Sequence, residues 1–268
     1  MSIKLIAADL DGTLLNSERR LSPDLFPLIR ALRERGIRFA PASGRQYYNL
    51  REMFAPIASE LLFISENGAM VGSGEEILSF EAMEQAQVVR AVEAVRELPE
   101  TYAILSCREG AFYEQREDTV FLENISYYFA RRRYTDDLLA LARSEPVCKV
   151  AVFSSRRAER VILPAMAGFA PDSHVVLSSA DWVDLIRADM NKGFAIGTIC
   201  GKLDIRPEEC MAFGDYLNDL EMLQSVGESY AMANAHPDLK AAARHVCPSN
   251  DEDGVCRTIR AALGLDKA

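Results

Sequence analysis

An apolar run that ends in two aspartates constrains this chain of 268 residues more than any other feature. Residues Ile3–Ala8 are almost all apolar, and Asp9-Leu10-Asp11-Gly12 follows them directly. Such a run is typical of a buried strand, and Gly12 allows a tight turn where the strand ends. Asp9 and Asp11 would then lie on the same side as the chain leaves the sheet. Two carboxylates so close predict either bound Mg²⁺ or a raised pKa on one of them. The alternative is a turn whose acids only cap backbone N–H groups.

Three further segments place polar groups at the ends of predicted strands or at a helix start. The run Ile37–Ala42 leads into Ser43-Gly44-Arg45, whose hydroxyl, flexible backbone and guanidinium suit a phosphate group. Asn191-Lys192-Gly193 opens an apolar helix, so Lys192 would lie at the helix start. A third apolar run, Cys210–Phe213, leads into Gly214-Asp215-Tyr216-Leu217-Asn218-Asp219. Together the segments supply enough oxygen ligands for a metal site.

With these four motifs in this order, the chain resembles the haloacid-dehalogenase-like (HAD) hydrolases of the Cof-type sugar-phosphatase branch over nearly its whole length. The family's Ile-x-x-Asn-Gly-Ala motif is present as Ile64–Ala69, and its tail as Asn250–Val255. The resemblance implies that Asp9 is the nucleophile, Asp11 the general acid/base and Lys192 a charge-neutralising group. It also implies three further sets of site residues: Mg²⁺ ligands Asp9, Asp11 and Asp215, with Asp11 using its main chain; phosphate or substrate contacts Leu10, Gly12, Ser43, Gly44, Arg45, Lys192 and Asn218; and supporting residues Gly214 and Asp219.

The function implied by the resemblance is Mg²⁺-dependent hydrolysis of small phosphorylated metabolites, such as sugar phosphates. Asp9 would form an aspartyl-phosphate, and Asp11 would protonate the leaving oxygen and then activate water. A phosphosugar mutase of the same architecture is one alternative. A metabolite-binding sensor without turnover is another, although the presence of Asp11 argues against it.

Two positions depart from the family pattern, and two basic features allow more than one interpretation. Ser43 stands where threonine is commoner, which keeps the hydroxyl. Tyr216 follows Asp215 where a glycine is usual, so a bulky phenol would stand beside the metal ligand. Arg45 either braces the phosphate site or pairs with an acid. Arg131-Arg132-Arg133 either meets a second anionic group of the substrate or forms a solvated helix end.

The order of predicted elements indicates an α/β protein with a Rossmann-like parallel sheet core, helices on both faces and a smaller α/β cap domain. Ser22-Pro23 predicts a helix start, and Gly36 predicts its end. A hairpin is expected within 69–80, and a second around Glu109-Gly110. The predicted division is a discontinuous core, 1–80 and 188–268, with 81–187 inserted between the motifs. The resemblance implies that this insertion is a cap that closes over the active site.

Composition limits the expected partners. The formal net charge of −10 argues against binding to nucleic acid or anionic membranes, which requires a basic surface. The longest stretch without charge, Val161–Pro171, is too short to span a bilayer. The six cysteines include no Cys-x-x-Cys pair and are expected to be reduced. We therefore expect a cytoplasmic protein, a monomer or weak homo-oligomer, whose partner is a small phosphate ester.

Overall fold

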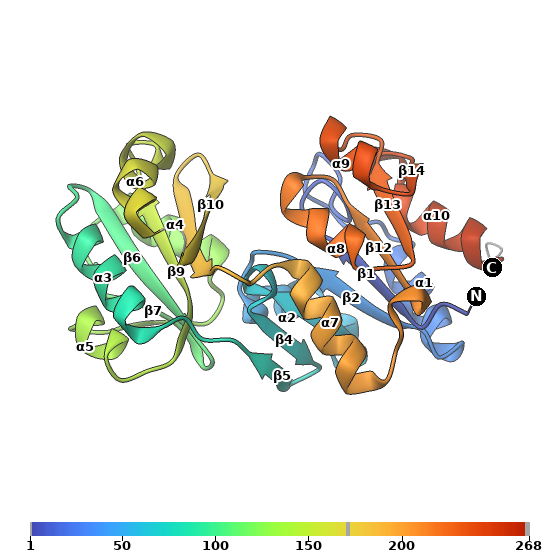
Figure 1. Cartoon of the computed structure of the whole chain (residues 1–268), viewed down its shortest axis with the longest axis horizontal. Coiled ribbons are helices and arrows are strands. Elements are labelled where there is room, and N and C mark those ends of the chain that lie inside the picture. The colour runs from blue at the N-terminus through green and yellow to red at the C-terminus, as the bar shows by residue number, and fades with distance from the viewer. Residues whose placement is uncertain (1, 170–171, 266–268) are drawn as a thin grey trace.

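The computed structural model describes residues 2–169 and 172–265, and in this part of the chain the strands form two sheets (Figure 1). The larger sheet has eight described strands in the order β14-β13-β12-β1-β2-β3-β4-β5. Their bounds are β1 (Leu5–Asp9), β2 (Arg38–Ala42), β3 (Leu62–Ser65), β4 (Met70–Ser73), β5 (Glu76–Phe80), β12 (Cys210–Gly214), β13 (Glu228–Met232) and β14 (His245–Cys247). Six of them run parallel, and β4 and β5 extend one edge as an antiparallel hairpin.

The order in which successive strands are added to this sheet reverses at β1, which pairs with β2 on one side and with β12 on the other. The helices of the core are α1 (Leu25–Glu34), α2 (Tyr47–Met53), α7 (Lys192–Leu203), α8 (Leu220–Gln224), α9 (Pro237–Ala242) and α10 (Gly254–Leu263). The connections through α1 and α2 move away from β1 in one direction, and those through α8 and α9 move away from β12 in the other. Because right-handed connections in opposite directions lie on opposite faces, these helix pairs cover the two faces of the sheet. Such a reversal leaves a crevice at the carboxyl ends of β1 and β12.

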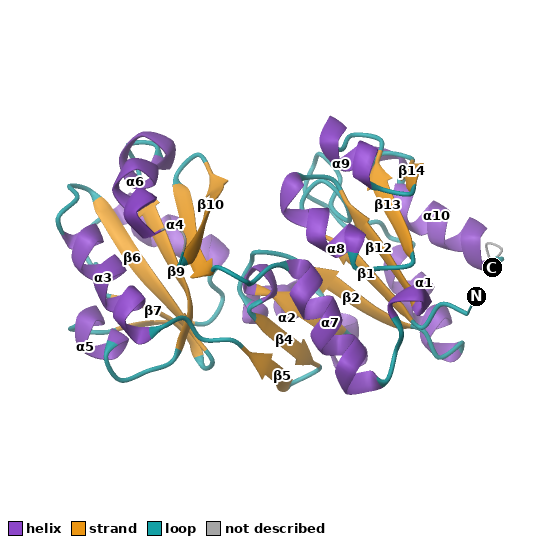
Figure 2. Cartoon of the chain, in the orientation of Figure 1, coloured by secondary structure: helices purple, strands orange, loops and turns teal. Residues whose placement is uncertain are grey.

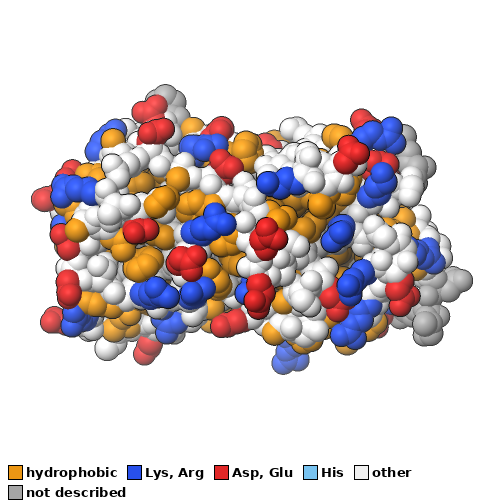
Figure 3. All heavy atoms as spheres, turned by 90° about the horizontal axis from the view of Figure 1, so that it is seen from below, with side chains coloured by type: hydrophobic (Ala, Val, Ile, Leu, Met, Phe, Trp, Pro, Cys, Tyr) orange, Lys and Arg blue, Asp and Glu red, His pale blue; other side chains and the backbone are white. Residues whose placement is uncertain are grey.

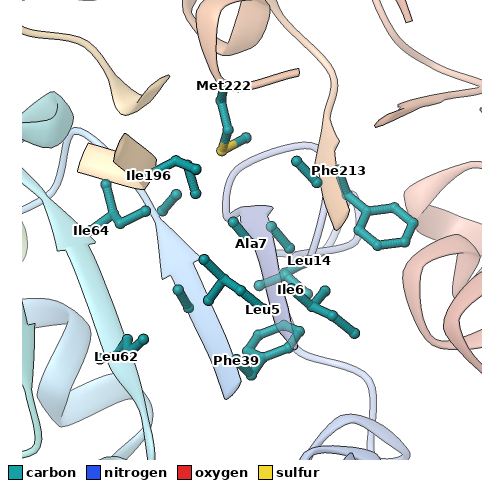
Figure 4. Packing of buried hydrophobic residues seen from close by; sticks show 14 of the residues in the cluster. Leu5, Ile6, Ala7, Leu14, Phe39, Leu62, Ile64, Ile196, Phe213 and Met222 are labelled. Atoms are coloured by element: carbon teal, nitrogen blue, oxygen red, sulfur yellow. The ribbon is translucent and has the colours of Figure 1, made fainter. Parts of the chain in front are cut away.

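The core is packed around the strands that carry the first and last motifs. Leu5, Ile6 and Ala7 of β1 are fully buried, and Figure 4 shows them between Phe39 of β2 and Phe213 of β12. Every residue of β1 is buried, as expected for a central parallel strand covered on both faces. The strand that ends at Asp9 is therefore fixed by packing along its whole length.

The second sheet is mixed and forms the cap domain (Figure 2). Its order is β10-β11-β9-β6-β7-β8, and only β7 and β8 pair in parallel. The bounds are β6 (Thr101–Cys107), β7 (Gly110–Tyr113), β8 (Arg132–Tyr134), β9 (Val147–Ser154), β10 (Ser173–Ser179), β11 (Trp182–Arg187), α3 (Gln85–Arg96), α4 (Thr119–Tyr128), α5 (Leu138–Ala142) and α6 (Ala158–Met166).

Residues of β9 alternate between the two faces of the cap sheet. Val150 and Val152 lie in an apolar cluster with buried residues of α3 and α6. Ala151 and Phe153 lie in a second cluster, with Phe121 of α4 and the single tryptophan, Trp182. This period of two gives the cap its own hydrophobic cores, separate from that of the larger sheet.

The structure confirms most predicted elements and corrects several. Both predicted hairpins form, as β4–β5 and β6–β7. The core sheet is not wholly parallel, because the first hairpin forms its edge. The helix predicted from Ser22-Pro23 begins at Leu25, because the Ser22 hydroxyl and carbonyl accept hydrogen bonds from the next residues and form a turn instead. Arg131-Arg132-Arg133 is not a helix end: α4 ends at Tyr128, and the last two arginines begin strand β8.

The distribution of charge on the surface agrees with the acidic net charge of the sequence. On the face shown in Figure 3, acidic and basic side chains are interspersed and do not gather into one basic field. None of the helices in the described residues is both long enough and apolar enough to cross a bilayer.

A turn after β3 packs closely against the residue that precedes α7. Gly68 has a φ of +100°, and a Cβ added there would lie 2.1 Å from the Asn191 carbonyl oxygen. Asn191 caps α7 by accepting a hydrogen bond from the Phe194 N–H at 2.8 Å. The glycine of the Asn-Gly-Ala motif is therefore required for this close approach.

We expect Gly68→Ala to reduce the free energy of unfolding by roughly 1 to 3 kcal/mol more than Gly264→Ala does. Gly264 also has a positive φ, +59°, but a Cβ there meets nothing within 4 Å, so its substitution measures the conformational cost alone. Denaturant unfolding of both variants provides the comparison. Equal losses would show that the contact with Asn191 has no energetic role.

Candidate active site

A cleft with a cavity volume of about 790 Å³ lies between the carboxyl ends of the core strands and the cap. Side chains from both domains line it. The core contributes Asp9, Asp11, Ser43, Lys192 and Asp215, and the cap contributes Phe129, Lys149, Trp182 and Asp184. The structure therefore brings the ends of β1, β2 and β12 and the start of α7 to one place.

Lys192 connects two buried carboxylates at the base of the cleft. Its side chain is only 1% exposed, and its ammonium group pairs with Asp9 and lies 2.5 Å from Asp219 Oδ1. Burial alone would lower the pKa of Lys192, but the carboxylates of Asp219 and Asp9 hold it above its ordinary value. Burial, reinforced by Asp219, raises the pKa of Asp9 well above its usual range, although Lys192 opposes this shift. The lysine is therefore charged, and it orients the carboxylate at the end of β1.

Asp215 lies beside Asp9 at the end of β12. The Thr13 hydroxyl donates a hydrogen bond to Asp215 Oδ1 at 3.0 Å. Burial, with a contribution from Asp219, raises the pKa of Asp215 to about 6. Gly12 has a φ of +85°, and a Cβ there would lie 2.3 Å from Asp215 Oδ2, so only glycine allows this turn to approach the carboxylate.

Asp11 is held away from this acidic cluster by Arg45. The guanidinium donates two hydrogen bonds to the carboxylate, from Nε at 3.0 Å and from an Nη atom at 2.7 Å. The Arg45 side chain is mostly buried, whereas that of Asp11 is half exposed in the cleft. Of the two interpretations of Arg45, pairing with an acid is the one that this structure contains, and the acid belongs to the site.

The predicted phosphate contacts lie in different positions. Ser43 is buried at the end of β2, and its hydroxyl accepts a hydrogen bond from the Arg45 N–H at 3.2 Å. Gly44 and the exposed Asn218 also line the cleft. Leu10 is fully buried in the core, so only its backbone is available to a ligand. Tyr216, 59% exposed, also lines the cleft, and its ring packs edge-on against His236.

The acidic cluster has donors suited to a hard divalent cation. Oxygens of Asp9, Asp215 and Asp219 lie within 4.8 Å of one another. Both carboxylate oxygens of Asp219 already have hydrogen-bond partners: Lys192 donates to Oδ1, and the N–H groups of Asp215 and Tyr216 donate to Oδ2. Lys192 donates to Oδ1 of Asp9 and Thr13 donates to Oδ1 of Asp215, so the Oδ2 atoms of both are the ones that a cation would meet. Carboxylate oxygens are the ligands that Mg²⁺ prefers, so these residues fit the expected metal.

Sequence reasoning missed three residues that shape the site. Thr13 supports Asp215, and its position directly after Gly12 in the first motif was an available signal. Lys149 is the only charged residue in the apolar run Val147–Phe153, which is an unusual place for a lysine. Gln46 follows Arg45, is buried and faces the cap. Nothing in its local sequence marks it.

The family model for haloacid dehalogenase-like hydrolases matches residues 6–259, which span the core, the cap and the cleft between them. This chain belongs to that family. The matched residues include all four motifs.

Two curated relatives match nearly the whole HAD-like chain. The 5-amino-6-(5-phospho-D-ribitylamino)uracil phosphatase of Escherichia coli is 31% identical over 98% of this chain and 97% of its own. An HMP-PP phosphatase of Cronobacter sakazakii is 30% identical over 91% of this chain and 89% of its own. The chain is accordingly an enzyme of the HAD phosphatase class.

Solved structures share the complete two-domain fold. A protein from Eubacterium rectale is 32% identical with a TM-score of 0.86, and the alignment covers 97% of this chain and 99% of that one. A haloacid dehalogenase-like hydrolase from Bacteroides thetaiotaomicron is 26% identical with a TM-score of 0.84, over 97% of this chain and 100% of that one. The cap is therefore part of the shared architecture.

The raised pKa values of Asp9 and Asp215 predict how Mg²⁺ should affect stability. Both carboxyl groups bind protons more tightly in the folded chain than in the unfolded chain, so the metal-free fold loses stability as the pH rises through about 6. Mg²⁺ requires the deprotonated carboxylates, so its stabilising effect should grow over the same range. At a hundredfold excess over Kd this effect reaches about 2.7 kcal/mol.

Thermal unfolding with and without Mg²⁺, at about pH 5 and about pH 7.5, measures this effect as a difference in Tm. We expect a larger Mg²⁺-dependent increase in Tm at the higher pH, and its loss in Asp215→Asn. An equal increase at both pH values, or one that persists in the variant, would contradict a metal site at Asp215.

Proposed function

We propose that this protein is a Mg²⁺-dependent phosphatase that hydrolyses small phosphorylated metabolites through an aspartyl-phosphate on Asp9. One observation carries the proposal. Asp9, a buried carboxylate at the end of β1, pairs with the buried Lys192. A second carboxylate, Asp11, lines the same cleft and is bound by a different cation, the guanidinium of Arg45. Two carboxylates in such different surroundings suit different roles, one as nucleophile and the other as acid and base.

In the first step, a carboxylate oxygen of Asp9 attacks phosphorus, and the bond from phosphorus to the ester oxygen breaks. Asp11 donates a proton to that oxygen, and the alcohol leaves. Asp11 then takes a proton from water, which attacks the aspartyl-phosphate and releases inorganic phosphate. Lys192, Ser43 and Asn218 would bind the phosphoryl oxygens on which charge develops.

Arg45 gives this scheme a way to free Asp11. The guanidinium holds the Asp11 carboxylate in the present structure, and an incoming phosphate would offer it a second anion in the same cleft. Transfer of Arg45 to the substrate would release Asp11 for proton transfer. We propose this exchange as the reason why both residues lie at the cleft.

Mg²⁺ would be held by Asp9, Asp215 and the main chain of Asp11, and when bound it would neutralise the negative charge of the nucleophile and the phosphate. Gly214 and Asp219 support this arrangement, because Asp219 fixes the backbone around Asp215 and a Cβ at Gly214 would lie 2.6 Å from Asp219 Cβ. The remaining proposed contacts are the backbone of Leu10, Gly12 and Gly44.

The cap would select the organic part of the substrate. Relatives named for a phosphorylated ribitylaminouracil and for HMP-PP support a small phosphorylated metabolite as the substrate class, and sugar phosphates belong to the same range. The proposed domain limits are 1–80 and 188–268 for the core and 81–187 for the cap. The end of β5 at Phe80 and the end of β11 at Arg187 support these limits.

Asp9→Asn should abolish steady-state turnover, because an amide cannot form the phosphoenzyme. Asp11→Asn should slow turnover by about 10² to 10⁴, the usual contribution of general acid–base catalysis. The matched control is Asp204→Asn, since Asp204 is exposed, lies outside the cleft and has a φ of 52° that asparagine tolerates. Steady-state kinetics on one good substrate compare the three variants. Near-normal turnover by Asp9→Asn would refute the covalent mechanism.

Turnover against a panel of phosphate esters tests activity and substrate class together. The panel should include sugar phosphates, nucleotides, flavin mononucleotide, pyridoxal phosphate and an activated aryl phosphate. We expect hydrolysis with Mg²⁺, none with a chelator, and little with Ca²⁺, whose longer bonds would misplace the nucleophile. Release of inorganic phosphate without a bisphosphate activator separates a phosphatase from a mutase. Binding without any release would favour a sensor.

A further inference from the structure

A lysine of the cap reaches into the core at the edge of the cleft. Lys149 lies on β9, and its side chain is 3% exposed. Its ammonium group donates a hydrogen bond to the Gly44 carbonyl at 2.8 Å. Gly44 lies between Ser43 and Arg45, so this one contact joins the cap directly to the loop proposed to bind phosphate.

Two buried carboxylates keep Lys149 charged. Glu66, on the core, lies 2.5 Å from the ammonium nitrogen, and Asp184, on the cap, lies 3.6 Å from it. Burial alone would lower the pKa of Lys149, but Asp184 and Glu66 hold it above its ordinary value. Because a buried cation is tolerated only beside its partners, the docked position of Lys149 depends on Glu66 of the core as well as on Asp184 of the cap.

Glu66 also belongs to a turn that hydrogen-bonds to the Ser43–Arg45 loop. The Glu66 N–H donates to the Arg45 carbonyl at 3.1 Å, and the Asn67 N–H donates to the Ser43 carbonyl at 3.2 Å. Both Glu66 and Asn67 have positive φ, 51° and 57°, in a buried turn. Three consecutive carbonyls, from Ser43 to Arg45, are thus fixed by this turn and by Lys149.

A second contact docks the cap on the residue that follows the loop. The Gln46 side chain donates to the Arg131 carbonyl at 2.8 Å and accepts from the Arg131 N–H at 3.0 Å. The Arg131 guanidinium lies over the Tyr48 ring, 4.6 Å from its centroid. The segment from Gly44 to Tyr48 is therefore one of the parts of the core that the cap contacts.

We propose that Lys149 is a positioning residue that sets the geometry of the Ser43–Arg45 loop when the cap is docked. It acts through Gly44 and Glu66 and not on the reacting atoms, since its ammonium group is already engaged by the Gly44 carbonyl and by the carboxylates of Glu66 and Asp184. This inference rests on the proposed phosphatase function. It makes cap docking a condition for a correctly placed Ser43 hydroxyl and Arg45 guanidinium, whatever the leaving group.

The test is Lys149→Met, assayed with an activated aryl phosphate and with the larger esters that the wild type hydrolyses. We expect kcat to fall by about tenfold to a hundredfold, and by a similar factor for every ester, because the phosphate loop is common to all of them. Calorimetric titration with inorganic phosphate in Mg²⁺ should show weaker binding by the variant. The control is Arg156→Met, which breaks an ion pair with Glu100 inside the cap and outside the cleft, and should leave kcat unchanged.

A second variant separates positioning from stability. Lys149→Met leaves Glu66 buried without its cation, whereas Lys149→Met/Glu66→Met also removes that carboxylate, and Asp184 keeps its hydrogen bond from the Ser178 hydroxyl. We expect the double variant to recover thermal stability while its kcat stays low, because methionine cannot donate to the Gly44 carbonyl. It also tests the proposal if the single variant does not fold.

Three results would overturn the inference. Recovery of kcat together with stability in the double variant would mean a purely structural role. Loss confined to the larger esters would mean that Lys149 contacts the leaving group. Unchanged kcat and phosphate affinity in Lys149→Met would mean that the contact has no effect. Failure of the proposed function is a different outcome: the wild type would then hydrolyse no ester, and the phosphate titration alone would decide the role of Lys149.

Discussion

The candidate active site depends on one buried ammonium group that balances two buried carboxylates. Lys192 enters from the first turn of α7, Asp9 from the end of β1 and Asp219 from the turn after β12. A buried charge is tolerated only beside its partners, so this contact fixes the position of α7 relative to the central strands. Asp219 in turn accepts hydrogen bonds from the N–H groups of Asp215 and Tyr216 and so fixes the backbone around Asp215. The geometry of the whole acidic cluster therefore follows from where the lysine lies.

The sequence predicted the core well because its signals are local. An apolar run followed at once by acids or by Ser43-Gly44-Arg45 places those groups at a strand end, and parallel strands bring their ends together. The cap was harder: for the region containing α4, β8 and α5, the one structural interpretation was a helix end at Arg131-Arg132-Arg133, and it was wrong. Lys149 shows why the rest was missed. Its partners, Gly44 and Glu66, are distant in sequence, Gly44 by 105 positions, and belong to the other domain. No local sequence pattern encodes such a contact.

The cap is more than a cover joined by two connecting segments. It contacts the core through side chains that follow the phosphate loop directly, and it shares a buried ionic group with the turn behind that loop. Ser43 and Arg45 of that loop line the cleft, so the surface proposed to meet the leaving group and the surface proposed to meet the phosphate are connected by direct contacts. Under the proposed function, substrate selection and phosphate binding would share one interface.

The order of strands also has a consequence for synthesis of the chain. β1 is made first, yet its neighbour β12 pairs Cys210 with Leu5, across the whole inserted cap. Until that late segment leaves the ribosome, one edge of this central, fully buried strand has no partner, and exposed strand edges are prone to pair with other chains. The cap, whose sheet contains only strands between Thr101 and Arg187, can form before the core is completed. The larger sheet, although its first strand is made first, can therefore be completed only after the whole cap has been synthesised.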